Sequence, residues 1–353
     1  MPIRKSFFGT AMNGEPVHLY TLTNKNSLCL EITNLGGRLV RLFLPDKNNQ
    51  FADVIMGFDR IESYLIRNPY FGALVGRFAN RISHAKFDLN GVTYQLDVNA
   101  GVHHLHGGQG GFDKLVWDAS TIVEEEQEKL LLKLKSKDNE DGYPGNLDVA
   151  VKYALTDKNE LIIEYDAVSD KDTYVNLTNH NYFNLAGHSS GSIHNHFIEM
   201  KASHYTPTDE FGMPTGETAP VEGTPIDLRK KTRMGDRIHS LFPQIIKNEG
   251  FDLNYILDKT EEFQSVCKVW EPDSGRTMEV FTTKPAMQFY TGNNIKNSFV
   301  FVGKQGYLYT QHCGFCLETQ YNPNSPNIST FPDVVLKAGE EYKHKTVYAF
   351  GVE

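Results

Sequence analysis

The sequence predicts an all-β fold, built as a large antiparallel β-sandwich. Short stretches of alternating apolar and polar residues dominate the chain, and such alternation is typical of half-buried strands. Turn-forming residues separate these stretches at intervals of roughly 8–12 residues, as in sandwiches and barrels. The longer periodicity of amphipathic helices is nearly absent.

Local patterns predict the individual elements. One short helix is expected around residues 60–69, and it should end before Pro69 because the residue that precedes a proline disfavours helical geometry. A hairpin is expected over 86–96, where Asn90-Gly91 joins two alternating stretches and suits a two-residue turn. Half-buried strands are expected at five further alternating stretches, residues 130–136, 147–156, 161–168, 265–270 and 277–283.

Length and composition favour one domain. The chain has 353 residues, of which 40% are hydrophobic and 22% charged, an ordinary globular composition. Sandwiches and barrels often reach this length as one unit, and no Pro-, Gly- or Ser-rich linker, low-complexity tract or clear repeat divides the sequence. We therefore expect a single domain over residues 1–353.

Charge restricts the partners. The net charge is −9 at pH 7, so the chain lacks the basic surplus that neutralises nucleic acid phosphates or an anionic membrane. The first residues show no apolar run like that of a signal peptide, and no stretch approaches the roughly 20 apolar residues of a membrane span. We expect a cytoplasmic protein that binds neither nucleic acid nor membrane.

Histidine and cysteine motifs leave a metal site open. In "GVHHLHGGQGG", an extended backbone would place His104 and His106 on one face and His103 on the other, so that two imidazoles could share a metal ion. "SIHNHF" supplies a second His-x-His pair, and spacing alone also allows structural histidines or metal-free acid–base work. Cys313 and Cys316 form a C-x-x-C, but no second pair exists and the segment alternates like a strand, which favours a structural role.

Several predicted strands also carry polar residues that a plain sandwich would not need. Each has an ordinary explanation on its own: a strand glutamate is usually solvated, an aspartate can cap a turn, and a histidine can be structural. Only convergence would make a site, and spacing does not establish it. The residues are Asn80, Arg81, His180, Tyr182, Asp252, Gln288 and Glu318.

Taken together, these stretches closely resemble the aldose 1-epimerase, or galactose mutarotase, family. The matching segments follow the family order and cover nearly the whole chain; they include "GRFANRI", "LHGGQGGFDKLVW", "VNLTNHNYFNLAG", "GFDLNYIL", "MQFYTGN" and "GFCLETQYNPNSPN". The resemblance implies a galactose mutarotase-like supersandwich with an open sugar-binding cleft. It also implies an isomerase that interconverts the α and β anomers of free aldoses such as D-galactose and D-glucose. No metal or nucleotide cofactor is implied, and the protein would be a monomer or weak homodimer.

Carried over segment by segment, the resemblance implies roles for eight residues. Glu318 in "CLETQ" would be the base, His180 in "TNHNYF" the acid, and His106 in "LHGG" a second active-site histidine. Sugar hydroxyls would be bound by a second group, Asn80, Arg81, Tyr182, Asp252 and Gln288. One departure is Leu253, which follows the aspartate of "GFD" where family members often have histidine, and which puts sugar preference in question.

The chemistry explains why these groups are needed. An aldopyranose changes anomer by losing the proton of O1, breaking the C1–O5 bond, gaining a proton on O5, turning about C1–C2 and reclosing. One base and one acid placed together suffice. A glutamate of reference pKa about 4.3 would be ionised, and a histidine of reference pKa about 6.5 could be an imidazolium if its surroundings hold the charge.

Five alternatives remain. A glycoside hydrolase would pair Glu318 with Asp252 as opposed carboxylates. A hexose-phosphate epimerase would use Arg77 and Arg81 to hold the phosphate, and a cupin-like metalloenzyme would use the histidines. The protein could also be an epimerase of a reducing disaccharide such as maltose, or a non-catalytic sugar-binding module of the same fold.

Overall fold

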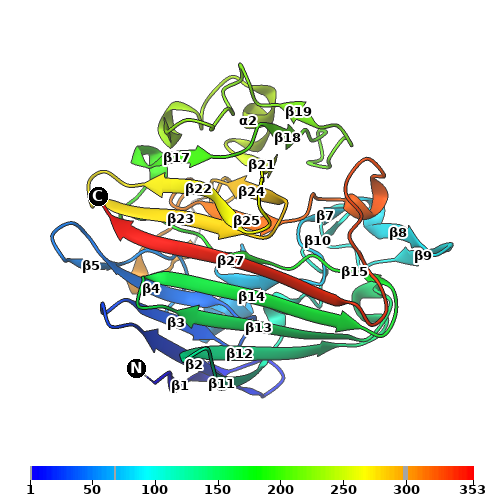
Figure 1. Cartoon of the computed structure of the whole chain (residues 1–353), viewed down its shortest axis with the longest axis horizontal. Coiled ribbons are helices and arrows are strands. Elements are labelled where there is room, and N and C mark those ends of the chain that lie inside the picture. The colour runs from blue at the N-terminus through cyan, green and yellow to red at the C-terminus, as the bar shows by residue number, and fades with distance from the viewer. Residues whose placement is uncertain (1, 67–68, 297–300) are drawn as a thin grey trace.

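The computed structural model describes residues 2–66, 69–296 and 301–353, and its described part consists mainly of antiparallel strands (Figure 1). The longest sheet has nine strands in the order β11-β12-β13-β14-β27-β23-β22-β17-β20. Its strands are β11 (Asp118–Glu124), β12 (Gln127–Ser136), β13 (Leu147–Leu155), β14 (Glu160–Ser169), β17 (Phe197–Met200), β20 (Thr232–Arg233), β22 (Gln264–Trp270), β23 (Arg276–Thr282) and β27 (Glu341–Val352).

Two five-stranded sheets lie against this one. The N-terminal sheet consists of β1 (Arg4–Thr10), β2 (Pro16–Thr23), β3 (Cys29–Thr33), β4 (Leu39–Pro45) and β5 (Phe51–Asp53), in that order. The second, here called the cleft sheet, has the order β19 (Ala219–Pro220), β18 (His204–Thr206), β21 (Asp252–Ile256), β24 (Ala286–Tyr290) and β25 (Cys316–Gln320). One buried apolar cluster contains side chains from all three sheets, so the predicted sandwich is confirmed.

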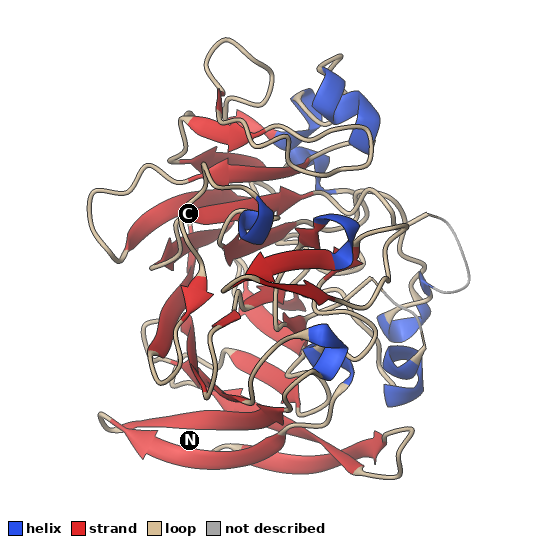
Figure 2. Ribbon diagram, turned by 90° about the vertical axis from the view of Figure 1, so that its right-hand side faces the viewer, coloured by secondary structure: helices blue, strands red, loops and turns tan. Residues whose placement is uncertain are grey.

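Short ribbons and helices connect the sheets. The ribbons are β6 (Ala73–Val75) with β16 (Thr178–His180), β7 (Arg81–Ile82) with β10 (His104–Leu105), β8 (Lys86–Leu89) with β9 (Val92–Gln95), and β15 (Thr173–Tyr174) with β26 (Val335–Leu336). The described α-helices are α1 (Ile61–Leu65) and α2 (Pro243–Asn248). The described 3₁₀ turns are η1 (Ser83–Ala85), η2 (Phe112–Lys114), η3 (Glu140–Gly142), η4 (Ile193–Asn195), η5 (Met234–Asp236), η7 (Lys304–Gly306) and η8 (Ser325–Asn327). Figure 2 shows that most helical segments lie on the side away from the nine-stranded sheet.

The local predictions agree with these elements, with two differences. The hairpin β8–β9 turns at Asn90 and Gly91, whose φ angles of 53° and 78° are the two positive values that a type I′ turn requires. The helix expected near residues 60–69 is shorter and ends at Leu65, and residues 67–68 lie outside the described part. α2 was not expected, although a proline begins it. None of the described helices is long and apolar enough to cross a membrane.

Burial separates the cleft sheet from an ordinary sandwich layer. β14 alternates between buried and half-buried residues, as a strand with one wet face does, whereas every residue of β24 and β25 is buried. One face of β24 and β25 carries Phe289 and Leu317 into the core. The opposite face carries polar side chains, and this polar buried face forms the site described below.

Candidate active site

Strand register brings the polar residues of the cleft sheet onto one face. Asn254 lies opposite Gln288, and Gln288 lies opposite Glu318. Directly opposed residues of antiparallel strands share a face, as do residues two positions apart on one strand. Asp252, Gln288 and Glu318 therefore face the same side. Nε2 of Gln288 donates a hydrogen bond of 2.6 Å to Oδ1 of Asp252.

A separate ribbon places His180 over this face. His180 ends β16, which pairs with β6, and its Nε2 lies 3.6 Å from Oε1 of Glu318. The ring stacks on Tyr182 at 5.0 Å between centroids, and its Nδ1 lies 3.4 Å from Sγ of Cys316. The Tyr182 hydroxyl donates to the carbonyl of Pro69, which fixes the supporting ring. Tyr182, expected to bind sugar, thus packs directly beneath the His180 imidazole.

His106 reaches the same place through a left-handed backbone. Its φ is 51°, its own N–H donates to the carbonyl of Asn80, and its Nδ1 accepts a 3.1 Å hydrogen bond from the Asn80 N–H. Because Nδ1 accepts, the neutral imidazole carries its proton on Nε2. The ring lies 5.4 Å from that of His180.

The other two histidines of the triplet have structural roles. His104 is buried, with Nδ1 bonded to the carbonyl of Asp97 at 2.7 Å and Nε2 to the hydroxyl of Tyr143 at 2.8 Å. Nδ1 of His103 accepts from the His84 N–H. An extended backbone would have put His104 and His106 on one face, but the strand β10 ends at Leu105 and the left-handed turn at His106 separates the two rings.

Three groups from distant parts of the chain therefore converge. One ligating atom from each of His106, His180 and Glu318 lies within 4.8 Å of the others, and all three residues are buried. Among the described residues, nothing donates a hydrogen bond to Oε2 of Glu318. By distance alone these groups could hold a metal ion or surround one reacting carbon.

Comparison with known proteins decides the family. A model of the aldose 1-epimerase family matches residues 18–349. The chain is 41% identical over 350 residues to galactose mutarotase of Sus scrofa, with 99% of each covered, and 35% identical over 346 residues to aldose 1-epimerase of Escherichia coli K12, with 97% and 98% covered. The chain belongs to the aldose 1-epimerase family.

A solved structure supports the same assignment. The galactose 1-epimerase structure from Lactobacillus acidophilus NCFM matches with a TM-score of 0.87 at 28% identity, covering 100% of this chain and 99% of that one. The resemblance, the mutarotase-like fold and the isomerase class that the sequence predicted are confirmed.

Burial sets the protonation of the central pair. It raises the pKa of Glu318 well above 4.5; the nearby Asp252 carboxylate raises this pKa further, and Arg81 opposes the shift. Burial also lowers the pKa of His180 to about 3. The expected carboxylate–imidazolium pair is therefore the less favoured form of the buried site, and the neutral acid with a neutral imidazole is preferred.

The remaining predicted residues line one continuous cleft. Its main part, about 1180 Å³, contains the His106–His180–Glu318 cluster, and an adjoining part of about 220 Å³ continues it. Asn80, Arg81, Asp252 and Gln288 line both parts, so all eight predicted residues border the cleft. The Asn80 side chain is partly engaged, since its Oδ1 accepts from the Arg81 N–H.

Two residues have a different place from the one expected. Arg77, offered with Arg81 as a phosphate clamp, is buried and bonded to Ser136 Oγ and to the carbonyls of Pro144 and Lys137. Leu253, the departure from the family pattern, is buried in the apolar core. It faces away from the side that carries Asp252, so the departure changes packing below the cleft rather than a group that faces it.

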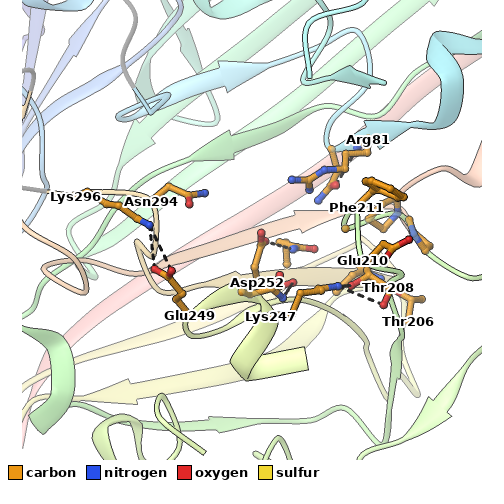
Figure 3. A pocket seen from close by; sticks show the side chains of 17 residues that line it. Arg81, Thr206, Thr208, Glu210, Phe211, Lys247, Glu249, Asp252, Asn294 and Lys296 are labelled. Atoms are coloured by element: carbon orange, nitrogen blue, oxygen red, sulfur yellow. Dashed lines mark hydrogen bonds and ion pairs between the residues drawn. The ribbon is translucent and has the colours of Figure 1, made fainter. Parts of the chain in front are cut away.

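Several cleft residues were not found from the sequence. The ring of Tyr70 lies 4.7 Å from His106 and 5.8 Å from His180, and it follows Pro69 without any motif that would mark it. In the adjoining part, Figure 3 shows Phe211 beside Arg81 and Lys247 below Asp252. These come from loops and from α2, where no alternating pattern directs attention.

The loop after His106 gives a structural test. Gly107 has φ +87°, and a Cβ there would lie 1.8 Å from the carbonyl oxygen of Gly76. We expect Gly107→Ala to displace His106, reducing both the thermal midpoint and the rate of anomer exchange. Gly14→Ala is the matched control, because Gly14 has the same φ of +87° but open space around it and lies outside the cleft lining, so only about 1 kcal/mol of stability should be lost. Equal effects of the two substitutions would contradict the close-approach argument.

Proposed function

We propose that this protein interconverts the α and β anomers of free aldoses, D-galactose and D-glucose among them, by acid–base-catalysed ring opening and reclosure. The observation that carries the proposal is the convergence of His106, His180 and Glu318, in which one buried carboxylate oxygen accepts no hydrogen bond from the described residues. Names of relatives, galactose mutarotase and aldose 1-epimerase, support the same reaction class.

The proposed reaction moves two protons about one hemiacetal carbon. Glu318 removes the proton of O1, the C1–O5 bond breaks as the C1–O1 carbonyl forms, and His180 delivers a proton to O5. Rotation about C1–C2 presents the other face of the carbonyl. His180 then takes the O5 proton back, O5 attacks C1, and Glu318 returns its proton to O1. No atom or electron is gained or lost over the cycle.

The pair holds one proton at both stages, although it is not the same proton. During ring opening that proton starts on His180, and in the open-chain stage it is replaced by the one on Glu318, with the imidazole neutral. Burial favours this second arrangement. A sugar hydroxyl that donates to Oε2 of Glu318 would favour the carboxylate again, because hydrogen bonds to the charged form lower a carboxyl pKa. A bound sugar would thereby reduce the preference for the neutral pair, which favours a reversible exchange.

The other cleft residues would bind and orient the sugar. Nε2–H of His106 can donate to an oxygen that gains charge as the ring opens, and Arg81 supplies a fixed cation nearby. Gln288 and Asp252 are already hydrogen-bonded to each other. The Asp252 carboxylate would accept from ring hydroxyls, and the Gln288 amide would accept from or donate to them. Tyr70 and Tyr182 give apolar surface beside the histidines.

Glu318→Gln tests the base. This substitution keeps the side chain's shape and removes its ability to accept a proton, so we expect anomer exchange to slow by about 10²–10⁴-fold with the fold intact. Polarimetry on freshly dissolved α-D-galactose measures the rate, and circular dichroism checks the fold. Glu222→Gln, at an exposed glutamate away from the cleft, is the control. Near-normal exchange in Glu318→Gln would contradict the assignment.

The same assay separates the alternatives. A chelator should leave the rate unchanged if anomer exchange needs no metal ion, and should abolish it in a cupin-like metalloenzyme. Release of reducing sugar from an aryl glycoside would indicate a hydrolase that pairs Glu318 with Asp252. A non-catalytic binding module would bind galactose without accelerating its mutarotation.

The pH profile tests the shared proton. The active pair carries one proton, so the acid limb of kcat/KM should follow the pKa of His180, about 3, and the alkaline limb the raised pKa of Glu318. Asp252→Asn removes a charge that raises the Glu318 pKa and should move the alkaline limb to lower pH. Arg81→Met removes a charge that lowers it and should move the limb to higher pH. Shifts of the opposite sign would overturn the proton count.

A reducing disaccharide such as maltose is the second candidate substrate. The cleft continues past Arg81 into the adjoining part, where Phe211 is 68% exposed and offers a ring on which a second sugar could stack (Figure 3). If it does, Phe211→Ala should raise KM for maltose by about 2–10-fold, the worth of one aromatic contact, and leave galactose unaffected. A polarimetric panel of fresh single-anomer sugars measures both. Equal changes for both sugars would remove the disaccharide subsite.

A further inference from the structure

A second cluster of histidines lies outside the sugar cleft. His194 belongs to η4, His239 follows η5, and His312 lies in the segment that leads into β25. One ring nitrogen from each lies within 4.8 Å of the others, and Nε2 of His194 is 3.5 Å from Nδ1 of His312. The ring centroids are 5.3–5.5 Å apart in all three pairs.

These separations match those of a metal site. Two imidazole nitrogens bound tetrahedrally to one zinc ion, each at about 2.0–2.1 Å, are about 3.3–3.4 Å apart. The 3.5 Å between His194 and His312 is close to that value. Imidazole is a preferred ligand of zinc, and three protein ligands leave one position for water.

His312 is already oriented as a ligand. Its Nε2 lies 2.9 Å from the carbonyl oxygen of Glu249, so Nε2–H donates there and the Nδ1 lone pair faces His194. Metal-binding histidines commonly donate their second N–H to a carbonyl in this way, which fixes the ring and its tautomer. His312 is buried, so this orientation is held by its surroundings.

Backbone contacts hold the three segments together. The N–H of Ile193, next to His194, donates to the carbonyl of His312 at 2.8 Å. A Cβ on Gly235 would lie 2.8 Å from the carbonyl oxygen of His194, so the absence of a side chain lets η5 approach closely. His239 is exposed and His194 half-buried, which leaves the cluster open to an ion from solution.

We propose that His194, His239 and His312 bind one Zn²⁺ ion with water in the fourth position. The ion would link three segments: η4, which carries His194, the segment after η5, which carries His239, and the segment with His312 that leads into β25, the strand of Glu318. Through the His312–Glu249 hydrogen bond it would also brace the turn before β21, the strand of Asp252. The site serves stability and does not depend on the proposed reaction.

Calorimetric titration of the full chain with ZnCl₂, after removal of bound metal, tests the site. We expect one equivalent to bind, and binding to weaken at least about tenfold in His239→Ala and in His312→Ala. His204→Ala, at an exposed histidine elsewhere, should bind as the unsubstituted chain does. Co²⁺ should give the visible absorption of a tetrahedral nitrogen-ligated ion, lost in His239→Ala even if His312→Ala fails to fold.

The cleft provides the competing outcome. His106, His180 and Glu318 are close enough to take the same ion, and zinc there would block the reacting groups. We expect one equivalent of Zn²⁺ to raise the thermal midpoint without slowing anomer exchange. Binding that persists in His239→Ala and stops anomer exchange would place the ion in the cleft and overturn the proposal, as would the lack of any saturable binding.

Discussion

The buried contact between the Glu318 carboxyl group and the His180 imidazole is the interaction on which the site depends. It joins the cleft sheet to the separate β6–β16 ribbon, with Nε2 of His180 3.6 Å from Oε1 of Glu318. Register across β21, β24 and β25 places Glu318 beside Gln288 and Asp252. The His180 imidazole stacks on Tyr182 and contacts Sγ of Cys316 through Nδ1. A one-residue shift of β25 would turn Glu318 toward the core, and the same shift of β24 or β21 would turn Gln288 or Asp252 away from the cleft, because side chains alternate between faces.

Burial of this contact makes the charged pair energetically costly, and in the proposed reaction it also lets the pair exchange protons with a substrate. Two opposite charges taken out of water are stabilised only in part by their mutual attraction, so the neutral pair competes with the ion pair. Burial is the main cause of the raised Glu318 pKa, and the charges of Asp252 and Arg81 act on it in opposite directions. A site of this kind can give a proton to one oxygen of a hemiacetal and take one from another without a change in its own total charge.

Much of this could be predicted from the sequence, and the reasons for the exceptions are physical. Alternation identified five strands of the nine-stranded sheet, β12, β13, β14, β22 and β23, but not β27, and Asn90-Gly91 located a hairpin, because both signals are local. The eight cleft residues were found through resemblance to a family; spacing could not show that β16 and β25 meet. His104 and His106 differ in position because the backbone at His106 is left-handed. The positions of Tyr70, Phe211 and the His194–His239–His312 cluster depend on how loops pack. Reference pKa values describe groups in water, and burial raises the pKa of Glu318 and lowers the pKa of His180 away from them. The single domain stays a prediction.

When no sugar is bound, we expect the buried pair to carry one proton, with Glu318 protonated and His180 neutral, because burial raises the pKa of the carboxyl group and lowers the pKa of the imidazole. Nitrogen-15 NMR of the histidine rings, with the His180 signal assigned by its loss in His180→Gln, measures this directly. We expect a neutral His180 ring from pH 7 down to pH 5, because burial lowers its pKa to about 3. A His180 signal that titrates near its ordinary value of about 6.5, or that is already an imidazolium at neutral pH, would contradict it.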